Sequence, residues 1–374
     1  MKETVKMDKL FTPIKIGKSQ LQQRIVMAPM ARFRADDSQT PLPFVKEYYT
    51  QRASTPGTLL ISEATFISPP TVGYLNMPAI YTPSQISAWK EITSAVHAQH
   101  SFIYMQIVAL GRAADISTLT AKGHDLVSSS AVPIGTFTPT PRALTEPEIK
   151  EYIHSFAEAA KNAIEAGFDG VEIHGANGYL VDQFIQDTCN RREDSWGGSI
   201  ENRSRFAIEV AKAVVAAVGA DRTGFRLSPF SQFQSMRMAD PIPQFSHLIR
   251  NLRSLNLAYL HLIEPRVLGE FDIDAKSHDS LNFALEIWGP DSPVIVAGGF
   301  KPGECRVDIE NRYGGYQVAV AFGRYFTSNP DLVFRIREGV EPRPYERETF
   351  YLPKMRRGYV DFSVCGEFDQ RVRV

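Results

Sequence analysis

The chain alternates along its length between two kinds of apolar segment, and this alternation restricts its fold more than any other feature. Short runs rich in β-branched residues end in glycine, proline or polar residues, and longer stretches with helical periodicity separate them. The short runs predict eight strands, at residues 25–29, 58–65, 102–107, 170–175, 224–229, 259–265, 294–299 and 318–324.

Four of the longer stretches predict helices, at residues 44–54, 83–99, 145–167 and 201–219, and further helices are expected between the later strands. The third of these helices has start and stop signals with a physical basis. Thr145 and Glu148 form a Thr-x-x-Glu pattern, in which each side chain can satisfy a backbone N–H at the helix start, and Gly167 follows the end.

Strand-then-helix units whose strands are apolar on both faces predict an α/β fold, a single (β/α)8 TIM barrel spanning residues 1–374. The alternative is an open doubly wound sheet, but the sequence has no G-x-G-x-x-G between the first strand and the first helix. Residues 110–142 are rich in serine, threonine and proline and lie between the third strand and the third helix. We expect them to form a loop insertion at the active site rather than a second domain.

The composition excludes several classes of function. Apolar residues make up 43% of the chain and the formal net charge is -1, without the basic footprint of a nucleic-acid-binding protein. The 3 cysteines are far apart, which argues against a disulfide framework or a CxxC metal pair. The N-terminus lacks the apolar core of a signal peptide, and no run approaches the roughly 18 apolar residues of a membrane span. We therefore expect a cytoplasmic protein, with neither nucleic-acid nor membrane partners, that acts on a small molecule.

In a barrel of this kind the functional residues lie at the carboxyl ends of the strands. Gly298 and Gly299 follow the seventh strand, and Gly323 and Arg324 follow the eighth. Glycines let backbone N–H groups approach an anion closely and a guanidinium matches phosphate oxygens, so these residues predict a phosphate site. The alternative is that the glycines only turn the chain and Arg324 forms a surface ion pair.

Two polar residues stand on otherwise apolar strands. Arg226 carries a permanent charge, which is costly to bury without an anion nearby. The electron-rich pyrimidine edge of a reduced flavin would compensate it, and so would an internal salt bridge to Glu172 or Glu63; the sequence leaves both open. Gln106 can donate and accept together, which suits the edge of a flavin pyrimidine or of a nucleobase.

His174, Asn177 and Tyr179 crowd together after the fourth strand. If Gly175 ends the strand, the imidazole and the carboxamide can converge to polarise a carbonyl oxygen, with a phenolic proton nearby. A single histidine or tyrosine at such a place is more often structural, but three at a barrel rim favour catalysis. Because HExxH, G-x-S-x-G and G-x-x-x-x-G-K-[ST] sequences are absent, we expect no metal and a cofactor that performs the difficult step.

The sequence resembles the flavin-dependent alkene reductases called Old Yellow Enzymes. Similar segments run nearly end to end and include LFTPIKIG, IVMAPMARFRA, HGANGYLVDQF, DSWGGSIENR, FRLSPFSQFQSM and FGRYFTSNPDL. PLPFVKEYY and GRAAD are most similar to the fungal branch with the chanoclavine-aldehyde reductases and isomerases of ergot alkaloid pathways. The resemblance implies an FMN-bearing barrel, a monomer or homodimer, in which NADPH reduces the flavin and the flavin reduces the C=C bond of an enal or enone.

The resemblance also implies roles for individual residues. His174 and Asn177 would hold the carbonyl oxygen, and Tyr179 would protonate the α-carbon after the hydride from flavin N5 reaches the β-carbon. The flavin would be held by Gln106, Arg226 and His174 at its pyrimidine, by Pro29, Met30, Ala31 and Ala64 at its ring, and by Gly298, Gly299, Gly323 and Arg324 at its phosphate. The substrate cavity would be shaped by Tyr74, Phe233, Phe271 and Tyr351.

Two positions bear on how such a protein would behave. Ala31 stands where many relatives have a threonine whose hydroxyl bonds the flavin, so we expect a lower flavin potential here. Relatives that isomerise their substrate tend to carry phenylalanine at the position of Tyr179, so the tyrosine favours net reduction over redox-neutral isomerisation. A flavin-binding protein without a redox substrate is a third alternative, although such a protein would have no need of the three polar residues above the ring.

Overall fold

The computed structural model describes residues 8–268, 271–274 and 279–372. Within them, nine strands form one sheet that closes on itself, because β4 (Leu59–Ile61) pairs with both β3 (Ile25–Met27) and β6 (Phe102–Val108). The short β5 (Thr65–Phe66) continues the line of β4 along β6. The other strands of the barrel are β9 (Gly170–Gly175), β10 (Thr223–Leu227), β11 (Tyr259–Ile263), β14 (Val294–Ala297) and β15 (Val318–Phe322).

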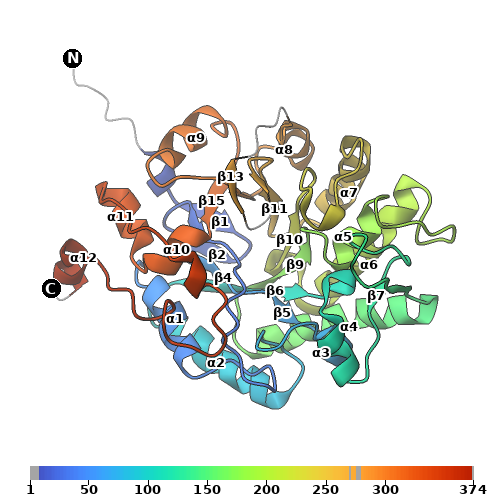
Figure 1. The fold of residues 1–374 in the computed structure, drawn as a ribbon. Helices are drawn as coiled ribbons and strands as arrows, with labels where there is room; N and C mark the ends of the chain where they lie inside the picture. Colours follow the sequence, from blue (N-terminus) through green and yellow to red (C-terminus); the bar gives the residue numbers. More distant parts are fainter. Residues whose placement is uncertain (1–7, 269–270, 275–278, 373–374) are drawn as a thin grey trace.

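Each barrel strand pairs in parallel with the next one along the chain, and β15 pairs in parallel with β3. The predicted (β/α)8 barrel is therefore confirmed, and the open sheet is excluded. Helices surround the strands (Figure 1). The principal ones are α1 (Phe44–Arg52), α2 (Pro83–His97), α4 (Glu146–Glu165), α6 (Ile200–Val218), α7 (Ile242–Ser254), α8 (Asn282–Trp288), α9 (Cys305–Asn311), α10 (Arg324–Ser328) and α11 (Leu332–Glu338).

The capping signals predicted for α4 are present. The backbone N–H of Thr145 donates to the carboxylate of Glu148 at 2.8 Å, and Gly167 has a φ of 87°, in the left-handed region that favours glycine. In the part of the chain that the structure describes, no helix is long and apolar enough to cross a membrane.

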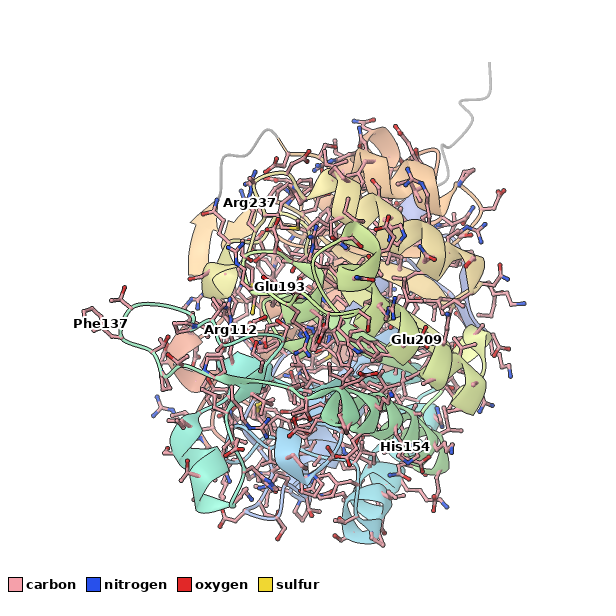
Figure 2. The ribbon with its side chains drawn as sticks, turned by 90° about the vertical axis from the view of Figure 1, so that its right-hand side faces the viewer. Arg112, Phe137, His154, Glu193, Glu209 and Arg237 are labelled. Atoms are coloured by element: carbon pink, nitrogen blue, oxygen red, sulfur yellow. The ribbon has the colours of Figure 1, made fainter. Side chains whose placement is uncertain are left out.

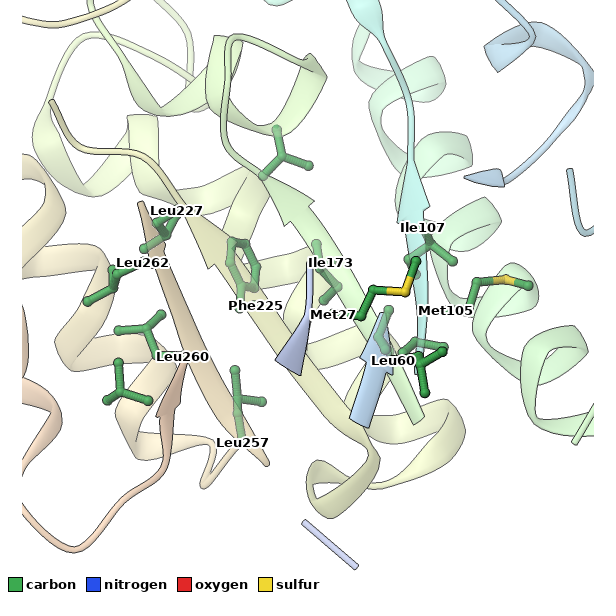
Figure 3. Close-up of a cluster of buried hydrophobic side chains, with 14 of the residues drawn as sticks. Met27, Leu60, Met105, Ile107, Ile173, Phe225, Leu227, Leu257, Leu260 and Leu262 are labelled. Carbon is green, nitrogen blue, oxygen red and sulfur yellow. The ribbon is translucent and has the colours of Figure 1, made fainter. Parts of the chain in front are cut away.

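The strands are buried on both faces because their side chains alternate between two hydrophobic clusters. Outward-facing side chains such as Ile173, Phe225 and Leu260 belong to the larger cluster, which they share with residues of the helices (Figure 3). Inward-facing side chains such as Leu59 and Ile295 fill the barrel itself. This double burial explains why the strand sequences are almost continuously apolar.

The interior of the barrel is divided into an apolar half and a polar half. On β3, β4, β14 and β15 the inward positions are aliphatic and belong to the inner cluster. On the four consecutive strands β6, β9, β10 and β11 the buried polar residues include Gln106, Glu172, His174, Arg226 and His261. The polar half opens toward the carboxyl ends of the strands, where the site lies.

A hairpin that the sequence analysis did not predict packs into the barrel interior. It consists of β1 (Ile14–Ile16) and β2 (Ser19–Leu21), which pair antiparallel across a turn at Gly17. Its apolar side chains join Tyr104 and Ala258 in the inner cluster, so the hairpin extends the core of the barrel.

The insertion at residues 110–142 contains local structure of its own. It includes η3 (Gly111–Ala113), α3 (Ile116–Ala121) and β7 (Val127–Ser128), which pairs with β8 (Arg142–Ala143). The Arg112 guanidinium donates to the carbonyls of Val132 at 3.1 Å and Gln234 at 3.0 Å, which ties the insertion to the segment after β10. The loop with the fully exposed Phe137 stands away from the rest of the molecule (Figure 2).

Candidate active site

Two cavities share lining residues at the carboxyl ends of the strands. The larger has a volume of about 550 Å³ and the smaller about 190 Å³, and both are lined by Met30, Arg226 and Arg324. A cavity of this combined extent suits an elongated ligand with a bulky end and a small end.

The structure brings the predicted site residues together around these cavities. The larger cavity is lined by Pro29, Met30, Ala31, Ala64, Tyr74, Gln106, His174, Asn177, Tyr179, Arg226, Phe233, Arg324 and Tyr351. Gly298, Gly299 and Gly323 line the smaller one. The one remaining candidate, Phe271, lies on β13 (Phe271–Asp274), and its side chain falls outside the described part of the structure.

The turn after β9 is held in place at several points. Asn177 has a φ of 58° and its backbone N–H donates to the Ser228 hydroxyl at 2.8 Å. Gly178 has a φ of 74° and its N–H donates to the buried Asp182 carboxylate at 2.8 Å. Tyr179 is the N-cap residue of α5 (Leu180–Ile185). β9 ends at Gly175, as predicted, and the left-handed turn follows two residues later, at Asn177 and Gly178.

The protonation state of His174 follows from its surroundings. Burial, followed by the charge of Arg226, lowers the pKa of His174 to about 3, so the imidazole is neutral at physiological pH. Its Nδ1 accepts the N–H of Ala176 at 3.3 Å, which leaves the single ring proton on Nε2. The Tyr179 ring meets the imidazole edge to face, with ring centroids 4.8 Å apart. His174 can therefore act as a neutral N–H donor beside a phenol.

Arg226 is almost fully buried and lines both cavities. Neither carboxylate that the sequence suggested as a partner forms an ion pair with it among the described residues. Glu172 instead binds His261 at 2.7 Å, and Glu63 accepts the backbone N–H of Arg32 at 3.1 Å. The Nε of Arg226 has no hydrogen-bond partner in the described structure. A buried guanidinium in this state favours a ligand with an electron-rich edge over an internal salt bridge.

The smaller cavity has the geometry of an anion cradle. Gly298 and Gly299, which follow β14, have φ values of 109° and 68°, so side chains would strain the backbone there. Gly323 and Arg324 lie across the cavity at the end of β15, and the Arg324 guanidinium stands 5.5 Å from the Tyr345 ring centroid. The glycines allow close backbone approach, and the arginine supplies a positive charge.

Aromatic rings form the outer wall of the larger cavity. Phe33, with a φ of 58°, meets Tyr74 and Tyr351 edge to face at centroid distances of 6.1 Å and 5.6 Å. The sequence analysis missed Phe33 and also Phe350, which lines the same cavity. Their positions two residues after Ala31 and directly before Tyr351 were the available signals. Among the described residues, no group of His, Cys, Asp and Glu side chains could hold a metal ion.

Comparisons with known proteins agree on one family. Residues 9–343 match the NADH:flavin oxidoreductase / NADH oxidase family. The chain is 54% identical over 367 residues to the chanoclavine-I aldehyde reductase fgaOx3 of Penicillium roqueforti, with 98% of this chain and 99% of that protein covered. It is 53% identical over 363 residues to the NADP-dependent oxidoreductase lnbE of Aspergillus flavus, with 95% and 96% covered.

Another similar protein has a name that points away from activity. The chain is 50% identical over 364 residues to the probable inactive reductase easA of Epichloe festucae var. lolii, with 96% of each covered. Among solved structures, the Old Yellow Enzyme from Pichia sp. AKU4542 superposes with a TM-score of 0.89 at 38% identity, covering 96% of this chain and 94% of that one.

Proposed function

The chain belongs to the NADH:flavin oxidoreductase / NADH oxidase family and is a flavin oxidoreductase of the Old Yellow Enzyme type, and from this premise we propose that it reduces the activated C=C bond of an α,β-unsaturated aldehyde or ketone. The observation that carries the proposal is the neutral His174 beside Asn177 and Tyr179 in one cavity. Relatives named as an aldehyde reductase and an NADP-dependent oxidoreductase support an aldehyde substrate and NADPH as the reductant.

The two cavities fit FMN. Arg226, whose Nε has no hydrogen-bond partner among the described residues, and Gln106 would hold the pyrimidine edge of the flavin. The ring would lie along Pro29, Met30, Ala31 and Ala64, and the phosphate would occupy the cradle of Gly298, Gly299, Gly323 and Arg324. When bound, FMN would supply hydride transfer, from NADPH to the β-carbon of the alkene.

His174 and Asn177 would bind the substrate by its carbonyl oxygen. The Nε2–H of His174 and the carboxamide N–H of Asn177 can both donate to that oxygen. The low pKa of His174 keeps the imidazole neutral. The imidazole can therefore donate this hydrogen bond without adding a second positive charge beside Arg226. Both bonds strengthen as negative charge develops on the oxygen, so they make the β-carbon more electrophilic.

Tyr179 would donate its phenolic proton to the α-carbon. Its ring lies against His174, and both residues line the larger cavity, so the hydroxyl would lie near the bound carbonyl group. Reduction of the alkene needs one proton for each hydride, and the resulting tyrosinate regains its proton from solvent. The presence of this proton donor favours net reduction over a redox-neutral isomerisation.

Anaerobic half-reactions test the proposal. NADPH should bleach the flavin absorbance of the purified protein, and a panel of enals and enones should restore it. Tyr179→Phe should leave the NADPH step unchanged and slow reoxidation by about a hundredfold or more, the usual range for loss of a general acid. Tyr74→Phe is the matched control, because it removes a phenolic hydroxyl from another wall of the same cavity.

The same experiment separates the alternatives. Product formed without net consumption of NADPH would identify an isomerase. A flavin that NADPH reduces but that no enal or enone reoxidises would favour a flavin-binding protein without this activity, as the name of the Epichloe relative suggests for that protein.

A further inference from the structure

A buried carboxylate lies inside the barrel near the predicted flavin site. Glu172 is on β9, two residues before His174, and has no exposed surface. Because side chains on a strand alternate, Glu172 and His174 point to the same side, into the barrel. A charge at this place needs an explanation, since burying an ionised carboxylate without partners is costly.

Three donors from two other strands of the barrel, β6 and β11, surround this carboxylate. Gln106 Nε2 donates at 2.7 Å, the Tyr259 hydroxyl at 3.0 Å and His261 Nδ1 at 2.7 Å. Burial alone would raise the pKa of Glu172, but His261 and Arg226 outweigh it and hold the pKa below its usual value. Glu172 is therefore ionised at neutral pH.

The carboxylate fixes which way the Gln106 amide points. An ionised carboxylate has no proton to donate, so the NH₂ group of Gln106 must face it. Gln106 also lines the larger cavity, and its Oε1 has no hydrogen bond to other described residues. The amide therefore presents an acceptor to a ligand in the cavity, which matches the N–H of a flavin pyrimidine.

The carboxylate also acts on Arg226 through its charge. No hydrogen bond joins the two groups in the described structure, yet Glu172 opposes the effect of burial, which lowers the pKa of Arg226. Burial lowers the pKa of His261, and Glu172 opposes this effect. Glu172 is thus the negative charge that offsets Arg226 beneath the cavity.

We propose that Glu172 is a positioning residue for the flavin: its carboxylate holds the Gln106 amide with the oxygen toward the cavity, and its charge lowers the reduction potential of the bound FMN. The proposal rests on the FMN site proposed above. Reduced flavin carries negative charge on its pyrimidine edge, so a fixed negative charge nearby disfavours the reduced form relative to the oxidised form.

Three variants separate charge from orientation. Glu172→Gln removes the charge and should stabilise reduced over oxidised FMN about tenfold, an upward shift of about 30 mV for a two-electron couple. Glu172→Asp keeps the charge but withdraws it from Gln106, so the potential should stay near that of the wild type while the apo-protein binds FMN about tenfold more weakly. Asp331→Asn is the matched control, because Asp331 is equally buried but pairs with Arg335 in the outer helices.

The potential is measured by reducing the FMN-bound protein together with a reference dye, and affinity by titrating apo-protein with FMN. An unshifted potential in Glu172→Gln, or an equal shift in Asp331→Asn, would overturn the proposal. If Glu172→Gln does not fold, unchanged FMN affinity in Glu172→Asp overturns it. Reoxidation of the wild type by an enone is a separate readout. If the wild type reduces enones but the potential of Glu172→Gln is unshifted, only the role of Glu172 is refuted. If the wild type binds no FMN, the role of Glu172 and the proposed function are both refuted.

Discussion

Replacement of Arg52 by leucine should lower the melting temperature of this protein by about 5 °C. Arg52 is fully buried, and burial lowers its pKa to about 10, so it remains charged at neutral pH. Its guanidinium donates to the carbonyls of Phe326 at 2.9 Å, Thr327 at 2.7 Å and Tyr359 at 3.2 Å. One side chain on α1 thus holds α10 and the C-terminal segment.

The size of the effect follows from these bonds. Each hydrogen bond to a charged group contributes about 1.5–3 kcal/mol, and loss of the buried guanidinium's own desolvation offsets part of the sum. Leaving the three carbonyls without this donor works against that offset, so a net loss of about 4 kcal/mol is expected. An unfolding entropy of about 2.1 cal/mol/K per residue over 374 residues gives about 0.8 kcal/mol/K, so a loss of about 4 kcal/mol corresponds to about 5 °C.

Calorimetry or circular dichroism at neutral pH measures the shift. Arg52→Lys should lie between the wild type and Arg52→Leu, since an ammonium keeps the charge but cannot span three carbonyls. Arg356→Leu is the surface control. The ion pair between Arg356 and Glu47, at 2.5 Å, is exposed, so its loss should lower the melting temperature by less than about 1 °C. A drop in Arg52→Leu no larger than that in Arg356→Leu would refute the reasoning.

Two further predictions concern the site. Ala31→Thr should raise the flavin potential by about 30 mV, because a hydroxyl at this cavity-lining position adds about one hydrogen bond to the reduced flavin; equal potentials, measured against a reference dye, would contradict this. The pKa of His174 falls from 6.5 to about 3 on folding. As the pH falls, His174 is therefore protonated in the unfolded chain at a higher pH than in the folded protein, so acid disfavours the native state. The stability of the wild type relative to His174→Asn should therefore decrease by about 2 kcal/mol from about pH 6.5 to about pH 5 in denaturant titrations, and a constant difference would rule it out. The raised pKa values of Glu63 and Asp182 act in the opposite direction but in both proteins alike.

The barrel could be predicted from the sequence because its signals are local. Strands buried on both faces are mostly apolar, and helices such as α4 show their periodicity and caps within a few turns. The hairpin of β1 and β2 was missed because it has no continuous apolar run like those that mark the barrel strands: Ile14, Ile16 and Leu21 alternate with polar residues over strands of only three residues. Structure within the insertion was missed because its elements are too short to show a period.

The contacts that hold the C-terminal segment against the barrel could not be predicted for a different reason. Arg32 and Arg34 donate to backbone carbonyls of residues 349–358, and Arg52 adds the carbonyl of Tyr359. Any residue supplies a carbonyl, so no residue type in the acceptor segment marks the contact. This contact holds Phe350 and Tyr351 at the cavity; the resemblance had implied Tyr351, whereas Phe350 was missed.

The buried polar side chains beneath the cavity, by contrast, follow a pattern that the strand sequences show. Polar residues occur at every second position of β9 and β11, as Glu172 and His174 and as Tyr259 and His261, and each pair faces the barrel interior because strand side chains alternate. An apolar strand tolerates such residues only where each finds a partner or a ligand. Glu172, Tyr259 and His261 partner one another, whereas the Nε of Arg226 has no partner in the described structure. His261 Nε2 also lacks a hydrogen-bond partner in the described structure, but only Arg226 of these two residues lines the cavities, so Arg226 is the residue that points to the ligand.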